Sequence, residues 1–457
     1  MHEERIAAGG NKAVLPRLTA AEWLLLLVLA SLQFTHSLDY MIMMPLMPHF
    51  EQEMGISPQQ FGFLVASYAF SAGVCSLLAA LFIDRFDRKR ALLGLYAGFI
   101  VGTLLCGVAP GYVTLLLART VAGAFGGVAA AVVLAVVGDV FADRQRGRAM
   151  GVVMTAFSVA LIAGLPAGLT LADNFGWRSA FRVLGVASAL VWIVAYRVLP
   201  PLRGHLARGR NRFADLWATL THPSHVRAYL LMIALVFSTL MIVPYLADYF
   251  VKNVGRPQTD LRWVYLFGGL STLLALPLVG RIADRFPKLI VFQTLALLAV
   301  IPALISTHLP PVSLALAIMA SSAFMVVTAS RMVPAMAMLT GCALPRYRGS
   351  FMTVNSSVQQ VAAGLAAIVG GLILGDTQAD APLKGFHVVG YLASAAMVLS
   401  AVLAGRLRPQ GAESLVAVDV LPGDVEAANI EEQQEQPVAS AAPPECADVA
   451  EPSHTGA

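Results

Sequence analysis

The sequence contains little charge. Only 13% of its 457 residues are Asp, Glu, Lys or Arg, whereas 58% are hydrophobic and the mean hydropathy is +0.72. An ordinary soluble domain has about 25% charged residues, and one or two globular cores could not bury this much apolar surface. The composition therefore excludes water-soluble enzymes and nucleic-acid-binding proteins, and it indicates a chain whose solvent is lipid.

Cysteine and the common catalytic motifs are also scarce. The 4 cysteines have no spacing typical of a metal site or a disulfide framework. There is no nucleotide-binding loop, metal-ligand cluster or nucleophile motif. We therefore expect no enzyme activity, no metal and no cofactor, and a proton gradient as the energy source. No cleavable signal peptide is evident, because the first apolar run begins near Trp23 and many others follow it.

Long apolar runs make up most of the chain. A helix needs about 20 residues to cross a bilayer. The runs are continuously apolar and do not alternate with a period of two, so they predict helices and not the strands of a barrel. Twelve spans are predicted: Glu22–Met47, Gln60–Ile83, Ala91–Ala109, Tyr112–Phe141, Ala149–Leu171, Phe181–Leu199, Tyr229–Tyr249, Trp263–Val279, Leu289–Ser306, Val312–Ala343, Ser350–Leu374 and Phe386–Ala404.

A stretch rich in proline and arginine divides these spans into two sets of six. An amphipathic helix is expected in this stretch around Phe213–Leu220, on the membrane surface. The end of the chain contains acidic residues but no Lys or Arg, and we expect it to be disordered. The predicted organisation is a cytoplasmic N-terminal segment (1–21), a six-helix half (22–199), a cytoplasmic linker (200–228), a second six-helix half (229–405) and an acidic cytoplasmic tail (406–457).

Lys and Arg gather in alternate loops, beginning with the N-terminal segment and the loop Arg85–Arg90. Cytoplasmic loops of membrane proteins carry an excess of these residues. We therefore expect an integral membrane protein with both termini in the cytoplasm, located in the inner membrane if the source is bacterial. The expected partners are the lipid bilayer, protons and a small-molecule substrate, with no nucleic acid, and we expect a monomer.

The two halves share short repeats. Asp84-Arg85-Phe86 follows span two, and it recurs 200 residues later, after span eight, as Asp284-Arg285-Phe286. Arg146-Gly147 precedes span five, and Arg348-Gly349 precedes span eleven. Repeated six-helix halves are a known transporter architecture with the substrate site between them. We predict an all-α membrane protein with twelve transmembrane helices in two six-helix, pseudo-symmetric halves.

Five motifs occur in register on these spans. They are Asp39-Tyr40-Met41-Ile42-Met43-Met44-Pro45-Leu46-Met47-Pro48, Asp84-Arg85-x-x-Arg88-Lys89, Arg119-Thr120-Val121-Ala122-Gly123, Gly164-Leu165-Pro166-Ala167-Gly168 and Phe175-Gly176-Trp177-Arg178. Together they resemble the major facilitator superfamily, and in particular its twelve-span drug:proton antiporters. The resemblance covers residues 20–405 and implies the major facilitator fold and transport by alternating access. Departures at Ala80, Asp87, Ala122 and Leu165 leave the subfamily open, and with it the direction and the substrate.

The loop after span two is a candidate gate. Asp84 can cap the next helix or pair with Arg85 or Arg88. Asp139, near the inner end of span four, is the expected partner of Arg88, as the resemblance also implies. Such a cluster would hold the inner helix ends together when the transporter faces outward. The alternative is a simple positive anchor at the cytoplasmic surface.

The second half repeats this loop with Asp284 and Arg285, which we also assign to gating. The position that corresponds to Asp139 is occupied by Gly341. The second latch is therefore expected to be weaker than the first.

The fifth span has a packing motif. Pro166 removes one helix hydrogen bond, while Gly164 and Gly168 permit close approach of a neighbouring backbone. Gly123 provides the same small surface on span four. We expect a tightly packed hinge that limits ion leak, and generic packing of small residues is an equally good interpretation.

Ionisable residues inside the spans give the sharpest functional signal, because burying them in lipid is costly. Asp39 lies in span one, and His36 lies one helical turn earlier on the same face. Arg119 in span four is the expected counter-charge of Asp39. Protonation of Asp39 would release Arg119, which is a minimal mechanism of proton coupling. The alternatives are a static ion pair and, for His36, a hydrogen-bonded structural residue.

Several other polar or aromatic residues of the spans are candidates for the substrate cavity. Arg331 in span ten could hold an anionic substrate or pair with a carboxylate of a neighbouring helix. The full set of candidates is Tyr40, Tyr68, Tyr245, Arg331, Asn355 and Gln359.

Three functions remain open on these grounds. The first is a secondary transporter that exports a small organic molecule in exchange for protons. The second is an uptake symporter or uniporter of the same fold, which would accumulate its substrate inside cells. The third belongs to another class: a membrane sensor built on a transporter scaffold, which signals through the acidic tail and shows no flux.

Overall fold

The computed structural model describes residues 18–141, 143–200, 202, 212–343, 348–376 and 381–407, and these residues form helices and short connections. They belong to one compact unit that ends at Pro409. Most of the predicted N-terminal segment and nearly all of the predicted acidic tail lie outside the described residues.

The twelve predicted spans are confirmed, since 12 helical segments of the described residues are long and apolar enough to cross a membrane. The first half contains α1 (Ala20–Ile42), η1 (Met44–Leu46), α2 (Met47–Met54), α3 (Pro58–Phe82), η2 (Ile83–Arg85), α4 (Arg88–Val108), α5 (Tyr112–Val140), α6 (Asp143–Val159), η3 (Ala160–Gly164), α7 (Leu165–Phe175) and α8 (Trp177–Val198). Then come α9 (Arg212–Thr221), α10 (Pro223–Leu240), α11 (Val243–Lys252), η4 (Gln258–Asp260), α12 (Leu261–Arg285), α13 (Lys288–Leu298), α14 (Val300–Thr307), α15 (Leu314–Ser330), α16 (Met332–Cys342), α17 (Arg348–Leu374) and α18 (Phe386–Ala404). The expected linker helix is present as α9.

Proline explains why several spans are interrupted. Spans seven, nine and ten each consist of two helices, and the hydropathy pattern did not predict these breaks. A proline lacks the N–H that would bond to the carbonyl four residues earlier, and its ring crowds that carbonyl. The breaks lie at Met241–Ile242, Ala299 and Arg331, and each is followed within three residues by a proline, namely Pro244, Pro302 and Pro334. In span five, Pro166 follows a π-helical turn at Ala160–Gly164.

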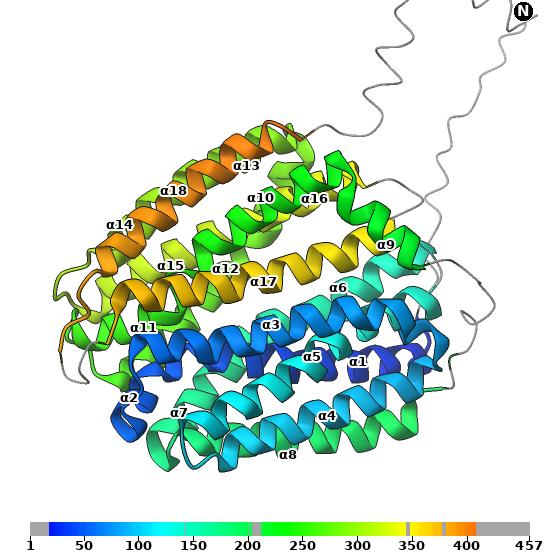
Figure 1. Ribbon diagram of the computed structural model, residues 1–457, viewed down its shortest axis with the longest axis horizontal. Helices are drawn as coiled ribbons and strands as arrows, with labels where there is room; N and C mark the ends of the chain where they lie inside the picture. Colours follow the sequence, from blue (N-terminus) through cyan, green and yellow to red (C-terminus); the bar gives the residue numbers. More distant parts are fainter. Residues whose placement is uncertain are drawn as a thin grey trace, which may run out of the picture. The chain divides into compact units, whose positions relative to one another are not determined.

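The helices before and after α9 pack against each other along two long seams, and α11 also packs against η1 and α2. Helix α3 lies against α17, and α7 with η3 lies against α12. In Figure 1, α3 (blue) and α17 (yellow) run side by side where the two sets of helices meet. Small residues permit this close approach. For example, a Cβ atom added to Gly62 would lie 2.6 Å from the backbone oxygen of Ala367.

The apolar core differs between the two ends of the bundle, which we call the α2 end and the α9 end after the short helices found there. At the α2 end one cluster contains residues of both halves, such as Phe50 and Trp177 with Tyr245 and Phe386. At the α9 end each half has its own cluster, and α3 alone among the described helices of the first half contributes to the second cluster. The two halves are therefore sealed together at the α2 end.

Candidate functional site

A buried ion pair lies inside the first half. The Nη1 atom of Arg119 on α5 donates to Oδ2 of Asp39 on α1 at 2.8 Å, and the two side chains are 1% and 0% exposed. The hydroxyl of Thr103 on α4 donates to the other carboxylate oxygen at 3.1 Å. The predicted pair is thus present, and three helices meet at it. Each charge compensates the other in an environment where an unpaired charge would be strongly destabilising.

Aromatic rings surround this pair. The Arg119 guanidinium carbon lies 4.2 Å from the ring centroid of Tyr68, which is a favourable cation–π distance. The rings of Tyr40 and Tyr68 are 5.6 Å apart, and the His36 ring lies 6.4 Å from that of Tyr68. Both ring nitrogens of His36 are buried without a hydrogen-bond partner among the described residues. The structure therefore brings the three predicted proton-coupling residues and two of the predicted cavity tyrosines into one cluster.

The glycine motifs lie directly against this cluster. A Cβ atom on Gly164 would meet the Leu38 side chain at 3.0 Å, and one on Gly168 would collide with Cδ1 of Ile42. Both partners belong to α1 and flank Asp39. On α5, a Cβ atom on Gly123 would collide with the carbonyl oxygen of Tyr68. The small residues therefore determine how closely α7, α5 and α3 approach the ion pair.

The candidate gate lies at the α9 end. The Nε atom of Arg88, at the start of α4, donates to Oδ2 of Asp139 on α5 at 3.1 Å. The Arg88 side chain is 9% exposed and that of Asp139 is 37% exposed. This predicted pair is present, and both of its residues belong to the first half. The Asp84 side chain lies outside what the structure describes. Arg85 is exposed to solvent.

The repeated loop of the second half has a different environment. Asp284 and Arg285 are both exposed at the end of α12, and no ion pair joins either of them to another described residue. Gly341 also lies at the surface. The weaker second latch stays a prediction.

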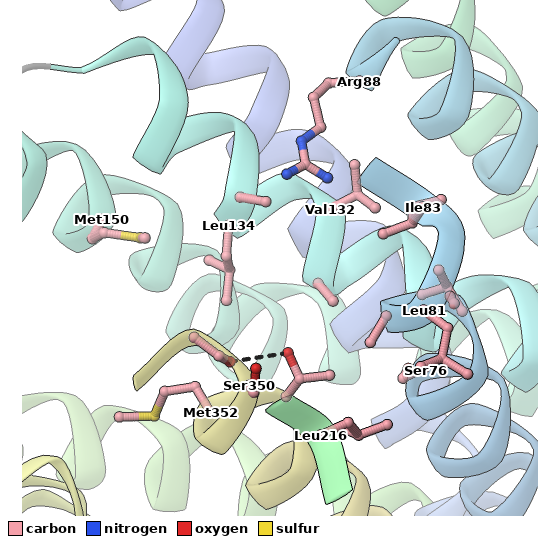
Figure 2. A pocket seen from close by; sticks show the side chains of 17 residues that line it. Ser76, Leu81, Ile83, Arg88, Val132, Leu134, Met150, Leu216, Ser350 and Met352 are labelled. Atoms are coloured by element: carbon pink, nitrogen blue, oxygen red, sulfur yellow. Dashed lines mark hydrogen bonds between the residues drawn. The ribbon is translucent and has the colours of Figure 1, made fainter. Parts of the chain in front are cut away.

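A pocket of about 550 Å³ opens between the halves at the α9 end. Figure 2 shows Arg88 on one side of it and Ser350 and Met352 of α17 on the other. Its polar groups include the hydroxyls of Ser76, Ser350 and Thr353, and most of the remaining lining is apolar. The volume and the lining are typical of a site for a small organic ligand.

The remaining cavity candidates are dispersed. Arg331 is fully buried at the break between α15 and α16, where its Nη2 atom donates to the hydroxyl of Thr239 at 2.7 Å. No carboxylate of the described residues forms an ion pair with Arg331. Asn355 is buried, and its amide oxygen has no hydrogen-bond partner among the described residues. Gln359 is partly buried. Tyr245 lies in the α3–α17 seam at the α2 end, where its hydroxyl donates to the Ala367 carbonyl at 2.5 Å.

One set of buried charged residues was not predicted from the sequence. Glu51 on α2 and Asp248 on α11 both lie close to the Lys252 ammonium group, and all three side chains are at least nine-tenths buried. Asp248 falls inside the predicted seventh span. An acidic residue at such a position is the signal that could have identified the set.

Comparison with known proteins agrees with this architecture. The profile of the Major Facilitator Superfamily matches residues 29–255 and 228–419. This chain belongs to the major facilitator superfamily. The superfamily assignment confirms the resemblance seen in the motifs, and it makes the chain a membrane transporter of this fold.

Three curated relatives show the range of similarity. An uncharacterized MFS-type transporter, YceJ, of Bacillus subtilis is 23% identical over 80% of this chain and 93% of its own length. A probable sugar efflux transporter of Mannheimia succiniciproducens is 23% identical over 61% of this chain and 69% of its own length. The putative transporter AraJ of Escherichia coli is 25% identical over 52% of this chain and 59% of its own length.

Solved structures show the same fold. A bacterial homolog of the human lysosomal transporter Spinster, in an inward-facing and occupied conformation, superposes with a TM-score of 0.69 at 16% identity. The alignment covers 86% of this chain and 98% of that protein. The unoccupied inward-facing structure gives a TM-score of 0.65 at 17% identity, over 86% and 96% of the two chains.

Proposed function

We propose that this transporter exports a small organic molecule across the cell membrane and that inward proton flow drives the export. The single observation that carries this proposal is the buried Asp39–Arg119 pair, in which an acidic group able to bind a proton meets a permanent cation inside the membrane. The names of two curated relatives, which are called probable sugar efflux transporters, support export as the direction.

The coupling step follows from the geometry of the pair. When Asp39 is ionised, its carboxylate holds the Arg119 guanidinium at 2.8 Å. When Asp39 binds a proton, that attraction is lost and Arg119 becomes available to another acceptor, such as an oxygen atom of the cargo. Gly164 and Gly168 pack on α1 beside Asp39. A shift of α1 caused by protonation of Asp39 would therefore also displace the hinge of the fifth span.

The distribution of basic residues supports one orientation of the protein in the membrane. Arg85, Arg88, Lys89 and Arg90 all lie at the α9 end, which the positive-inside tendency assigns to the cytoplasm. Both termini then lie in the cytoplasm, and the pocket at the α9 end accepts cargo from that side. The sealed α2 end faces outward.

The chemistry of the pocket favours a cargo with hydroxyl groups. Three side-chain hydroxyls and the Arg88 guanidinium offer hydrogen bonds, and the apolar remainder suits the carbon skeleton of a small molecule. Sugars and sugar-like compounds are therefore the first substrates to examine.

The decisive experiment uses purified protein in proteoliposomes that contain a pH-sensitive dye. An inward-directed proton gradient is imposed, and sugars, amino acids, carboxylates and cationic drugs are supplied in turn. Export coupled to protons predicts that one class of compound moves protons, in the direction opposite to its own movement. Substrate flux without proton movement would contradict the coupling, and movement of both in the same direction would indicate a symporter.

A further inference from the structure

The charged cluster at the α2 end joins the two halves of the transporter. Glu51 belongs to α2 in the first half, whereas Asp248 and Lys252 belong to α11 in the second half. The Lys252 ammonium group forms an ion pair with the Glu51 carboxylate, and it lies 3.3 Å from Oδ2 of Asp248. The side chains of Glu51, Asp248 and Lys252 are 3%, 0% and 7% exposed. Opening of this end must therefore separate buried charges and expose them to water.

The charges of this cluster do not balance when all three groups are ionised. Two carboxylates and one ammonium group give a net charge of −1, which is costly to bury. The Glu51 and Asp248 carboxyl groups lie close enough to interact directly. Oε1 of Glu51 and Oδ1 of Asp248 are buried with no hydrogen-bond partner among the described residues, and Oδ2 of Asp248 has only the Lys252 ammonium nitrogen at 3.3 Å. One proton between the two carboxyl groups would neutralise the cluster and supply the missing donor.

Other ionisable groups near the cluster have partners of their own within one half. On α2, His49 lies 3.1 Å from Asp173, and Glu53 lies 2.9 Å from Arg178. These pairs belong entirely to the first half, so opening between the halves does not separate them.

No further ion pair joins the cluster among the described residues. Arg256, which follows α11, pairs with Asp260 at 2.6 Å. Tyr249 stacks on Phe386 of α18, and the ionisable residues beside Phe386, Lys384 and His387, are exposed. Tyr245 and Tyr249 of α11 donate to backbone carbonyls at 2.5 and 3.1 Å. His308, at the end of α14, lies against the Leu304 carbonyl and the Tyr391 hydroxyl. η1 has no ionisable side chain, Tyr68 of α3 lies at the Arg119 site, and the ionisable residues of α10 lie near its start at the α9 end. The ionisable groups in contact with one another in this cluster are therefore Glu51, Asp248 and Lys252.

We propose that Glu51, Asp248 and Lys252 form a proton-binding latch, which takes up one proton from the outer side when the α2 end closes and returns it to that side when the end opens. The assignment of the α2 end to the outer side rests on the proposed function. Because uptake and release occur on the same side, the latch moves no net proton across the membrane. It makes the closed outer end more populated in acid, which favours the return step of an exchange cycle.

The test measures opening of the α2 end directly and needs no substrate. Spin labels are attached at Gly111→Cys, between α4 and α5, and at Ser313→Cys, before α15, in a chain whose native cysteines are replaced with alanine. A Cβ atom at Gly111 meets no other atom within 4 Å, and Ser313 is exposed. Electron–electron resonance distances are then recorded in lipid nanodiscs between pH 5 and pH 8.

The proposal predicts that the ratio of open to closed protein rises with pH, with a limiting slope of about tenfold per pH unit for one linked proton. Asp248→Asn keeps the Glu51–Lys252 pair and removes the excess charge, so its ratio should lose this slope. Lys252→Met leaves two carboxylates without a cation, so at neutral pH it should be more open than the wild-type protein.

Glu53→Gln is the matched control, because it removes a carboxylate from the same helix without touching the latch, and it should keep the wild-type slope. An unchanged slope in Asp248→Asn, or no pH dependence in the wild-type protein, would overturn the latch. A protein that opens with pH as predicted but moves no substrate in proteoliposomes would instead count against the proposed export function.

Discussion

At the scale of single residues, the main question is whether the Asp39–Arg119 pair carries protons or only stabilises the fold. Both roles require a buried pair, and the structure shows one in which neither side chain is more than 1% exposed. The two roles differ in what happens when both charges are removed together. A structural role can be restored by a neutral pair, whereas a proton-carrying role cannot.

We predict that Asp39→Asn abolishes transport driven by a pH gradient. It should also destabilise the protein by about 3–5 kcal/mol, because it leaves the Arg119 charge buried without a partner. The double variant Asp39→Asn with Arg119→Gln should recover most of the thermal stability and still move no protons. Melting temperature and dye-reported proton flux, measured on the same preparations, separate the two effects. Gradient-driven transport by the double variant would show that the pair is only structural.

The gate at the α9 end leads to a second prediction about a single residue. Asp139 is more than one-third exposed, so its pairing with Arg88 should contribute only about 0–1 kcal/mol to stability. On the hypothesis that this contact takes part in gating, Asp139→Asn should leave the melting temperature almost unchanged and yet reduce the transport rate. Initial rates of substrate flux at matched protein content provide the measurement. A normal rate would leave Arg88 and Asp139 as surface anchors.

At the scale of helices, small residues decide which surfaces approach each other. Gly123 and Gly138 lie on the same helix, α5, but their surroundings differ. A Cβ atom at Gly123 would collide with the Tyr68 carbonyl and the Ser71 hydroxyl, whereas one at Gly138 would meet nothing within 4 Å. Glycine is thus required for packing at the first position and not at the second.

We predict that Gly123→Ala destabilises the protein by about 1–3 kcal/mol, because backbone atoms of α3 would have to move. Gly138→Ala is its control, and it should be neutral or stabilising by up to about 1 kcal/mol, because alanine favours the helix. Thermal unfolding in detergent compares the two variants. Equal effects of both substitutions would mean that the α3–α5 contact is looser than the structure shows.

At the scale of the whole molecule, the two ends of the bundle differ. One apolar cluster is shared by both halves at the α2 end, and a pocket of about 550 Å³ separates them at the α9 end. A transporter in this state accepts small molecules from one side only. In the orientation that we propose, this asymmetry corresponds to a conformation open to the cytoplasm.

Chemical accessibility tests this sidedness. In a chain without native cysteines, Ser350→Cys lies in the pocket and Ser313→Cys lies at the opposite end. A membrane-impermeant maleimide should label Ser350→Cys in inside-out vesicles and Ser313→Cys in right-side-out vesicles. The opposite pattern would reverse the orientation, and it would also place the latch of Glu51, Asp248 and Lys252 on the cytoplasmic side.

The sequence by itself determined the membrane environment, the twelve spans and the repeated loops, because hydropathy and motif spacing are local properties. A helix in lipid satisfies its own backbone hydrogen bonds, so its existence can be predicted one segment at a time. The pairs Asp39–Arg119 and Arg88–Asp139 could also be predicted, since a charge in a span is stabilised by an opposite charge and few candidates exist.

Only the tertiary structure decided which end is sealed, where the pocket lies and that Glu51 meets Asp248 and Lys252. These features depend on how two halves pack, and no local pattern specifies which side chains meet across that contact. The prolines that follow Ala299 and Arg331 indicate helix breaks there. The direction in which the chain continues after each break depends on the neighbouring helices. Packing between distant helices, and not hydropathy, therefore determines which buried charges meet and where the pocket lies.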